Sequence, residues 1–175
     1  MTQRIRRIEA DEGPLLRELR LRALSDSPGA FASTFDDEAR RPADAWGTDA
    51  AARSAGNESA TFFIEAERGV AGFVGAYRSD DEGTTVELVS MWVTPGTRCR
   101  GMGEQLVEHV VGWARETGAR RVGLWVVRGN ARAIDLYQRA GFVTTERLEP
   151  FDAHPCHAEL RLVRDLDSDD RREVP

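Results

Sequence analysis

The chain contains no lysine, so all 24 basic residues among its 175 are arginine. Arginine keeps its charge at any pH near neutrality, and without lysine the protein carries no side-chain amine of its own. Acidic residues number 30, which gives a formal net charge of -6. An acidic chain of this kind is a poor candidate for general nucleic-acid binding. We therefore expect no nucleic acid among its partners.

Cysteines and long apolar stretches are also scarce. The two cysteines, Cys99 and Cys156, are too few for a disulfide framework or a four-cysteine zinc site. No apolar run approaches the roughly 18 residues of a membrane-spanning helix, and residues 1–7 lack the apolar core of a secretory signal. These absences predict reduced thiols, no membrane partner and a cytoplasmic location.

The length and composition suit one domain with a core of its own. Hydrophobic residues make up 41% of the 175, which allows a core that needs no disulfide or structural metal. No internal repeat or linker divides the chain. We predict a single domain over residues 1–164 and a charged, mobile tail over residues 165–175.

Hydrophobic periodicity predicts strands that alternate with helices. Strands are expected near residues 4–8, 61–66, 70–77, 85–93, 121–127, 142–146 and 158–163, and helices near residues 11–24, 34–55, 104–117 and 130–140. Segment 85–93 is apolar on both faces, which is typical of a central strand. Segment 121–127 follows a helix, so a right-handed crossover would place it parallel to that strand.

A glycine-containing turn joins the expected central strand to an amphipathic helix. It reads, in order, Arg98, Cys99, Arg100, Gly101, Met102 and Gly103. Glycine lets the main chain approach a ligand closely, and free N–H groups at a helix N-terminus attract anions such as phosphate. The pattern lacks the third glycine of a dinucleotide fingerprint and the lysine of a phosphate-binding nucleotide loop. On the glycines alone, an anion site and a plain strand-to-helix turn are equally supported.

Two motifs resemble the coenzyme-binding motifs of the GNAT superfamily of N-acetyltransferases. The pattern Arg98-x-x-Gly101-x-Gly103 resembles its acetyl-CoA pyrophosphate motif, and segment 130–142 looks like its second coenzyme motif. The order of elements over residues 4–163 is similar to that of the family as well. Cys99 is a departure, because the family usually has glycine at this position.

The resemblance implies an α/β (α+β) fold with a mixed, mostly antiparallel sheet of about seven strands flanked by four helices. It also implies that the two central strands splay apart and that acetyl-CoA, the co-substrate, lies between them. A main-chain N–H near Met91 would then face the thioester carbonyl. The residues implied to bind the coenzyme are Met91, Trp92, Val93, Arg98, Cys99, Arg100, Gly101, Met102, Gly103, Asn130, Ala133 and Tyr137.

Two residues are expected to handle protons. Tyr137 lies where the family often has its general acid, seven residues after Asn130, although packing alone would also suit this tyrosine. Glu87 is the candidate base, because a carboxylate in an apolar strand needs a reason to be there. One alternative is that Glu87 stands at an edge position and reaches solvent. Another is a chain of water with no single essential base. Trp125 stands where some relatives have a glutamate.

Two loops are implied to wall off the acceptor. The residues expected to line it are Phe31, Phe35, Trp46 and Phe151, and those expected to attract an amine are Asp36, Asp37 and Asp152. His154, Cys156 and His157 cluster near Asp152, but their spacing fits no common zinc pattern, so no metal is predicted. His109 is expected on the solvated side of its helix.

The sequence thus predicts an enzyme that moves an acetyl group from acetyl-CoA directly to a primary amine, with a small molecule as the favoured acceptor. A protein or peptide amine is the alternative acceptor, and a non-catalytic acyl-CoA-binding regulatory module is the alternative class. The oligomeric state stays open, with a homodimer as one option.

Overall fold

The computed structural model describes residues 3–67, 69–79, 84–150 and 158–167. Its strands are β1 (Arg4–Arg7), β2 (Ser59–Ala66), β3 (Gly69–Arg78), β4 (Thr85–Val93), β5 (Arg121–Val127), β6 (Val143–Pro150) and β7 (Ala158–Asp165). Its helices are α1 (Gly13–Asp26), α2 (Phe35–Ala39), α3 (Ala43–Ser54), α4 (Met102–Glu116) and α5 (Ala131–Arg139), with short 3-10 turns at Pro28–Ala30 and Pro95–Thr97. The predicted alternation of strands and helices is confirmed.

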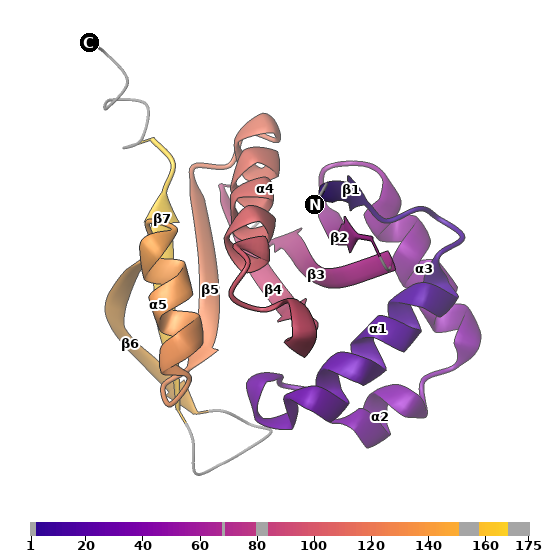
Figure 1. The fold of residues 1–175 in the computed structure, drawn as a ribbon. Helices are drawn as coiled ribbons and strands as arrows, with labels where there is room; N and C mark the ends of the chain where they lie inside the picture. The colour runs from indigo at the N-terminus through magenta and orange to yellow at the C-terminus, as the bar shows by residue number, and fades with distance from the viewer. Residues whose placement is uncertain (1–2, 68, 80–83, 151–157, 168–175) are drawn as a thin grey trace.

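The strands form one seven-stranded sheet in the order β1-β2-β3-β4-β5-β7-β6 (Figure 1). Neighbouring strands are antiparallel except β4 and β5, which run parallel and are joined by the crossover through α4. The mixed, mostly antiparallel sheet is therefore as expected.

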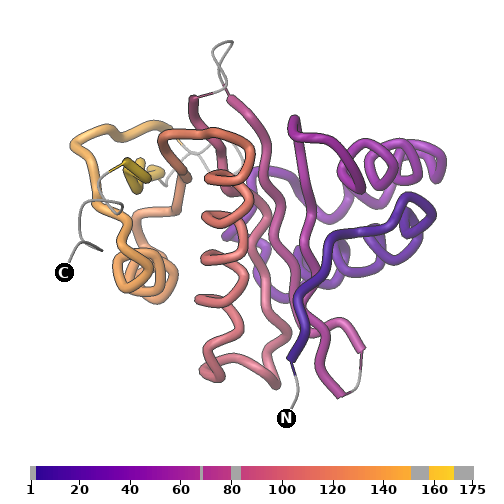
Figure 2. The backbone as a smooth tube through the Cα atoms, turned by 90° about the horizontal axis from the view of Figure 1, so that it is seen from above, coloured from indigo at the N-terminus to yellow at the C-terminus, as the bar shows by residue number. Residues whose placement is uncertain are grey.

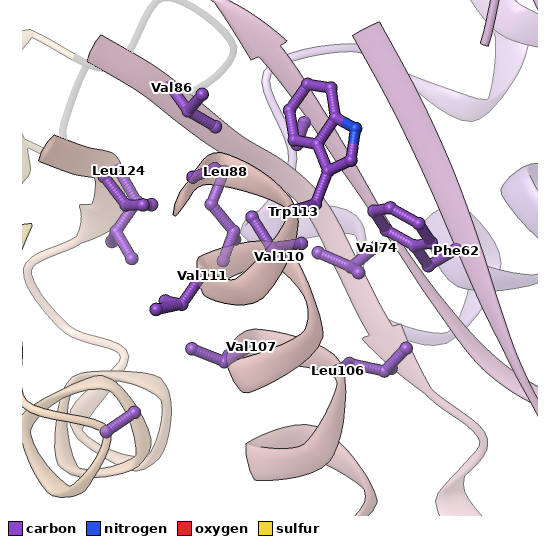
Figure 3. Close-up of a cluster of buried hydrophobic side chains, with 14 of the residues drawn as sticks. Phe62, Val74, Val86, Leu88, Leu106, Val107, Val110, Val111, Trp113 and Leu124 are labelled. Carbon is purple, nitrogen blue, oxygen red and sulfur yellow. The ribbon is translucent and has the colours of Figure 1, made fainter. Parts of the chain in front are cut away.

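The helices form two layers, one on each face of the sheet (Figure 2). Alternate residues of β2 show the division, because Phe62 packs in the cluster with α4 while Phe63 packs in the cluster with α1 and α3. The first cluster is drawn in Figure 3, where α4 packs its apolar side chains on the strands. Those labelled are Leu106, Val107, Val110, Val111 and Trp113 of α4 and Phe62, Val74, Val86, Leu88 and Leu124 of the strands.

The described residues contain five helices, so the expected number of four is wrong. The error lies in segment 34–55, which forms α2 and α3 rather than one helix. Pro42, which lies between them as the N-cap of α3, has no N–H to donate and disfavours helical geometry at the residue before it. Thr34 caps the start of α2 by accepting a hydrogen bond from the main-chain N–H of Asp37 at 3.2 Å.

At the other end, the packed structure continues past residue 164. Strand β7 reaches Asp165, and Leu166 is buried, with its N–H donating to the carbonyl of Arg120 at 2.8 Å. The rest of the predicted tail, from residue 168, lies outside the described residues. No helix in the described ranges is long and apolar enough to cross a bilayer.

Candidate active site

The two parallel strands at the centre of the sheet separate soon after they begin. Strands β4 and β5 share three residue pairs, the last of which joins Glu87 to Gly123. Beyond that pair they diverge toward their C-terminal ends (Figure 1). A cavity of about 620 Å³ opens there, between β4, β5, the start of α4 and α5. The expected splay is confirmed, and this space is called the coenzyme-side cavity below.

A bulge shapes the β4 wall of this cavity. Phe73 of β3 pairs with Trp92, but Gly75 pairs with Val89, so Ser90 and Met91 together stand opposite a single residue of β3. Ser90 has a φ of 55°, which is uncommon for a residue with a side chain. A bulge interrupts the regular pairing of two strands and changes the direction of the main chain. In this protein the change falls at Ser90 and Met91, next to the N–H of Met91.

The glycine turn leads from β4 into α4 through two left-handed residues. Cys99 has a φ of 65° and Gly101 a φ of 75°. Gly101 is the N-cap of the 15-residue helix α4 and has no side chain to cap it, which leaves the first N–H groups of the helix for a ligand. Gly103 lies so close to α5 that a Cβ would stand 2.6 Å from Cδ1 of Leu136. This arrangement fits the pyrophosphate of a coenzyme.

The side chains of Arg98 and Trp92 serve to hold the turn in place. Arg98 donates from Nε to the carbonyl of Val93 at 2.9 Å and pairs with Asp26 at the end of α1. Trp92 donates from Nε1 to the same carboxylate at 3.0 Å. The side chain of Trp92 therefore points into the α1 layer, and only its main chain faces the coenzyme-side cavity.

Asp26 is a residue that the sequence did not single out. Partial desolvation opposes its ionisation, but the hydrogen bonds from Trp92 and Arg98, among others, outweigh that effect and hold the pKa of Asp26 below its usual value. The carboxylate thus stays charged at neutral pH and links α1 to β4 and to the turn.

Cys99 is exposed and lies beside an arginine of α5. The Nη2 of Arg132 is 3.0 Å from the sulfur, and both residues line the coenzyme-side cavity. Arg132 was not among the expected site residues. Arg132 belongs to the second motif, and its guanidinium brings a positive charge close to the glycine turn.

Helix α5 supplies the opposite wall. The Oδ1 of Asn130 accepts a hydrogen bond from the N–H of Ala133 at 3.2 Å, which caps the helix and leaves the amide NH₂ as a donor. Tyr137 is 7% exposed and lines the cavity. Among the described residues its hydroxyl has no hydrogen-bond partner, and burial raises the pKa of Tyr137. The phenol therefore stays protonated at neutral pH.

A second cavity, of about 590 Å³, is lined by residues of β3 to β7 together with Arg20 of α1 and residues 30–32. It is called the acceptor-side cavity below. It shares six lining residues with the coenzyme-side cavity, so the two meet at the bulge; these are Ala30, Phe31, Leu88, Val89, Ser90 and Trp125. The guanidinium groups of Arg147 and Arg161 each lie 5.4 Å from the centroid of the Trp125 ring.

Glu87 lies on this second wall. It is 7% exposed, so the expectation of an edge residue that reaches solvent is wrong. Each of its carboxylate oxygens accepts a hydrogen bond from Arg161 at 2.5 Å, and Ser79 donates to one of them at 3.3 Å. A role of Glu87 as the base stays a prediction, and both of its oxygens are already engaged by the guanidinium of Arg161.

The expected acceptor residues are scattered. Phe31 lines both cavities, whereas Phe35 is 44% exposed and Trp46 is buried in the core cluster with α1. Asp36 and Asp37 are exposed on α2. The residues Phe151, Asp152, His154, Cys156 and His157 lie outside the described residues.

His109 lies on the exposed side of α4, as expected, with its ring edge-on to Phe62 at 4.6 Å. In the described part of the chain, no three histidine, cysteine, aspartate or glutamate residues are grouped so that they could hold a metal ion. The prediction of no metal at His154 to His157 stays a prediction, because that loop is not described.

Strands β4 and β5 thus separate near a bulge, and a glycine turn leads from β4 into α4, whose start has no side-chain cap. Residues 21–142 match the acetyltransferase (GNAT) family. The chain belongs to this family.

Individual relatives differ in how much of the chain they match. The streptothricin acetyltransferase of Streptomyces lavendulae is 38% identical over 87 residues, which is 49% of this chain and 45% of that enzyme. The matched regions span under half of the curated relatives' own length.

Solved structures match the fold over nearly the whole chain. A GNAT-family acetyltransferase of Streptococcus pneumoniae is 19% identical, with a TM-score of 0.79 over 94% of this chain and 100% of that one. A Salmonella typhimurium protein solved with its cofactor acetyl-CoA is 22% identical, with a TM-score of 0.77 over 95% of each chain.

Proposed function

We propose that this protein transfers the acetyl group of acetyl-CoA directly to a primary amine of a small molecule. The observation that carries the proposal is the coenzyme-side cavity, which opens where β4 and β5 separate and ends at the uncapped start of α4. Acetyl-CoA would supply an activated acetyl group there. The main chain of residues 98–103 would bind its pyrophosphate, and β4 from Met91 to Val93 would bond its pantetheine arm.

The reaction needs a site for the oxyanion and a proton for the leaving thiolate. As the amine nitrogen forms its bond to the acetyl carbon, negative charge grows on the carbonyl oxygen, and the N–H of Met91 is proposed to stabilise it. The C–S bond then breaks, and Tyr137 is proposed to give its phenolic proton to the sulfur, while the nitrogen loses its extra proton to water, from which the phenolate takes a proton back. The raised pKa of Tyr137, and a hydroxyl without a hydrogen-bond partner among the residues that the structure describes, support that role.

The amine must lose a proton before it attacks. Glu87 was the expected base, but its two oxygens already accept hydrogen bonds from Arg161. A route through water in the acceptor-side cavity therefore fits better than a single essential base. The direct attack needs no enzyme nucleophile, so Cys99 has no covalent role in the proposal.

A small-molecule acceptor is favoured by the form of the acceptor-side cavity. Its volume of about 590 Å³ suits a ligand of drug-like size, and the side chains around it are charged and aromatic. The similarity of 87 residues to a streptothricin acetyltransferase supports the same class.

A thiol-release assay with acetyl-CoA and a panel of amines tests the proposal. The expected result is release of CoA thiol that depends on a small amine. Release only with peptides that have a free α-amine or lysine would favour the alternative acceptor. Tight acetyl-CoA binding without release for any amine would instead indicate a non-catalytic binding module.

A further inference from the structure

The side chain of Arg161 crosses a neighbouring strand on its way to Glu87. Arg161 belongs to β7 and stands opposite Trp125 of β5, whereas Glu87 belongs to β4, on the far side of β5. The guanidinium passes over Gly123 of β5, where a Cβ would stand 2.0 Å from Nη2 and 2.6 Å from Cζ. Only a residue without a side chain leaves this path open. Glycine within a strand commonly marks such a close approach.

The contact at the end of this path is a buried, two-fold ion pair. The oxygens of Glu87 accept from Nη1 and Nη2 of Arg161 at 2.5 Å each. The exposed fractions of the two side chains are 9% and 13%. Parallel hydrogen bonds of a guanidinium to a carboxylate hold both the distance and the orientation of the two groups.

The position of this pair along the strands is informative. Glu87 and Gly123 form the last pair of the β4–β5 ladder, and the coenzyme-side cavity begins with the next residue of β4, Leu88. That ladder has three residue pairs, whereas the ladder between β5 and β7 has seven. The pairing between β4 and β5 is therefore short. Arg161 links β4 to β7 at the end of this pairing, where β4 and β5 separate.

We propose that the Glu87–Arg161 ion pair, seated over Gly123, fixes the point at which β4 and β5 separate and thereby sets the width of the coenzyme-side cavity. Both residues are positioning residues, which act on the coenzyme through the strands. The proposal rests on the proposed function, because it concerns acetyl-CoA in that cavity. It also explains why a buried carboxylate lies in an apolar strand, without giving that carboxylate the role of the base.

The main experiment measures acetyl-CoA affinity by titration calorimetry for Arg161→Met. The variant keeps the length of the side chain but cannot bind Glu87, so we expect the Kd to rise at least fivefold. Arg121→Met is the matched control, because Arg121 forms an exposed ion pair with Asp165 at 2.6 Å that joins only β5 and β7. Its Kd should stay within twofold of the wild type.

Failures of the two proposals look different in this experiment. A wild-type protein that does not bind acetyl-CoA overturns the proposed function, and this inference with it. A wild-type protein that binds, together with an Arg161→Met Kd changed less than fivefold, overturns the positioning role alone. An equal loss in Arg121→Met also overturns it.

Because Arg161→Met leaves a buried carboxylate unpaired and can fail to fold, Glu87→Gln is the second variant. The amide can still accept one hydrogen bond from Arg161, so we expect a rise in the KM for acetyl-CoA and a kcat within tenfold of the wild type. The acid limb of the pH profile of kcat should be unchanged. A loss of kcat of about 100-fold or more, with unchanged KM and loss of that limb, would make Glu87 the base and overturn the proposal.

Discussion

The two cavities that meet at the bulge differ in what forms them, because one depends on the main chain and the other on side chains. The coenzyme-side cavity depends on the main chain, with a bulge at Ser90, a left-handed turn at Gly101 and the start of α4. The acceptor-side cavity is lined by paired charged side chains, Arg147 with Glu149 and Glu87 with Arg161, although we propose that the second pair also sets the width of the coenzyme-side cavity. Main-chain sites tolerate many sequences, whereas side-chain sites change with single substitutions. In the proposed function, acetyl-CoA would occupy the main-chain site and the acceptor amine the side-chain site.

The largest expected effect comes from the one side chain that the mechanism needs on the coenzyme side. Tyr137→Phe should lower kcat by about 100-fold, because the thiolate then leaves without a proton donor. The Kd for acetyl-CoA should not change, since the hydroxyl has no role in holding the coenzyme. Steady-state kinetics with calorimetry measure both quantities.

Thr48→Val is the control, because it also removes a hydroxyl, and Thr48 is an exposed residue of α3 that lines neither cavity. Its kcat should stay within about threefold of the wild type. An unchanged kcat in Tyr137→Phe would remove Tyr137 from the acid role.

The turn offers the next largest effect. Gly101→Ala places a Cβ on a residue with a φ of 75°, which costs about 1–2 kcal/mol, so acetyl-CoA should bind roughly 5- to 30-fold more weakly. Gly112→Ala changes a glycine in the interior of α4 with open space around it and should leave the Kd unaltered. Equal Kd values for the two variants would mean that the main chain of the turn does not hold the coenzyme.

A smaller effect should come from the Asp26 carboxylate, which links α1 to β4 and to the glycine turn. Asp26→Ala removes the partner of Arg98 and Trp92, so the turn loses its tie to α1. We expect a Kd for acetyl-CoA raised by about threefold to tenfold, equivalent to about 1 kcal/mol. Asp11→Ala, in the exposed turn before α1, is the comparison variant. If both variants bind acetyl-CoA as the wild type does, the tie has no part in shaping the turn.

The smallest effect should lie outside both cavities. Burial lowers the pKa of His109 below its ordinary value of 6.5, so the unfolded chain binds a proton more readily than the folded protein. Stability should therefore decline slightly as the pH falls below about 6.5, and His109→Gln should reduce that slope. Thermal melts recorded between pH 5 and pH 8, at roughly two pH values per pH unit, would measure this slope. A slope that is equal in both proteins would mean that His109 titrates as it does in the unfolded chain.

The coenzyme side could be predicted from the sequence because its signals are local. Gly101 and Gly103 stand two residues apart, and Asn130 precedes its helix directly, so short patterns carry the geometry. The bulge at Ser90 was missed, since no glycine or proline marks it. The division of segment 34–55 at Pro42 was also missed, although the proline signalled it.

The acceptor side was less predictable because its contacts join distant residues. Arg161 lies 74 positions after Glu87, and no local sequence pattern at either residue indicates that the two form a pair. The one local sign was Gly123 inside an apolar strand, which indicates a close approach but not by which group. Asp26 was missed for the same reason, because its partner Arg98 is 72 positions away.

The most direct test of the central claim is a calorimetric titration of the wild-type protein with acetyl-CoA. The account predicts saturable binding of one acetyl-CoA molecule per protein chain, with a melting temperature that rises with the coenzyme concentration. The absence of binding heat, together with an unchanged melting temperature, would contradict it.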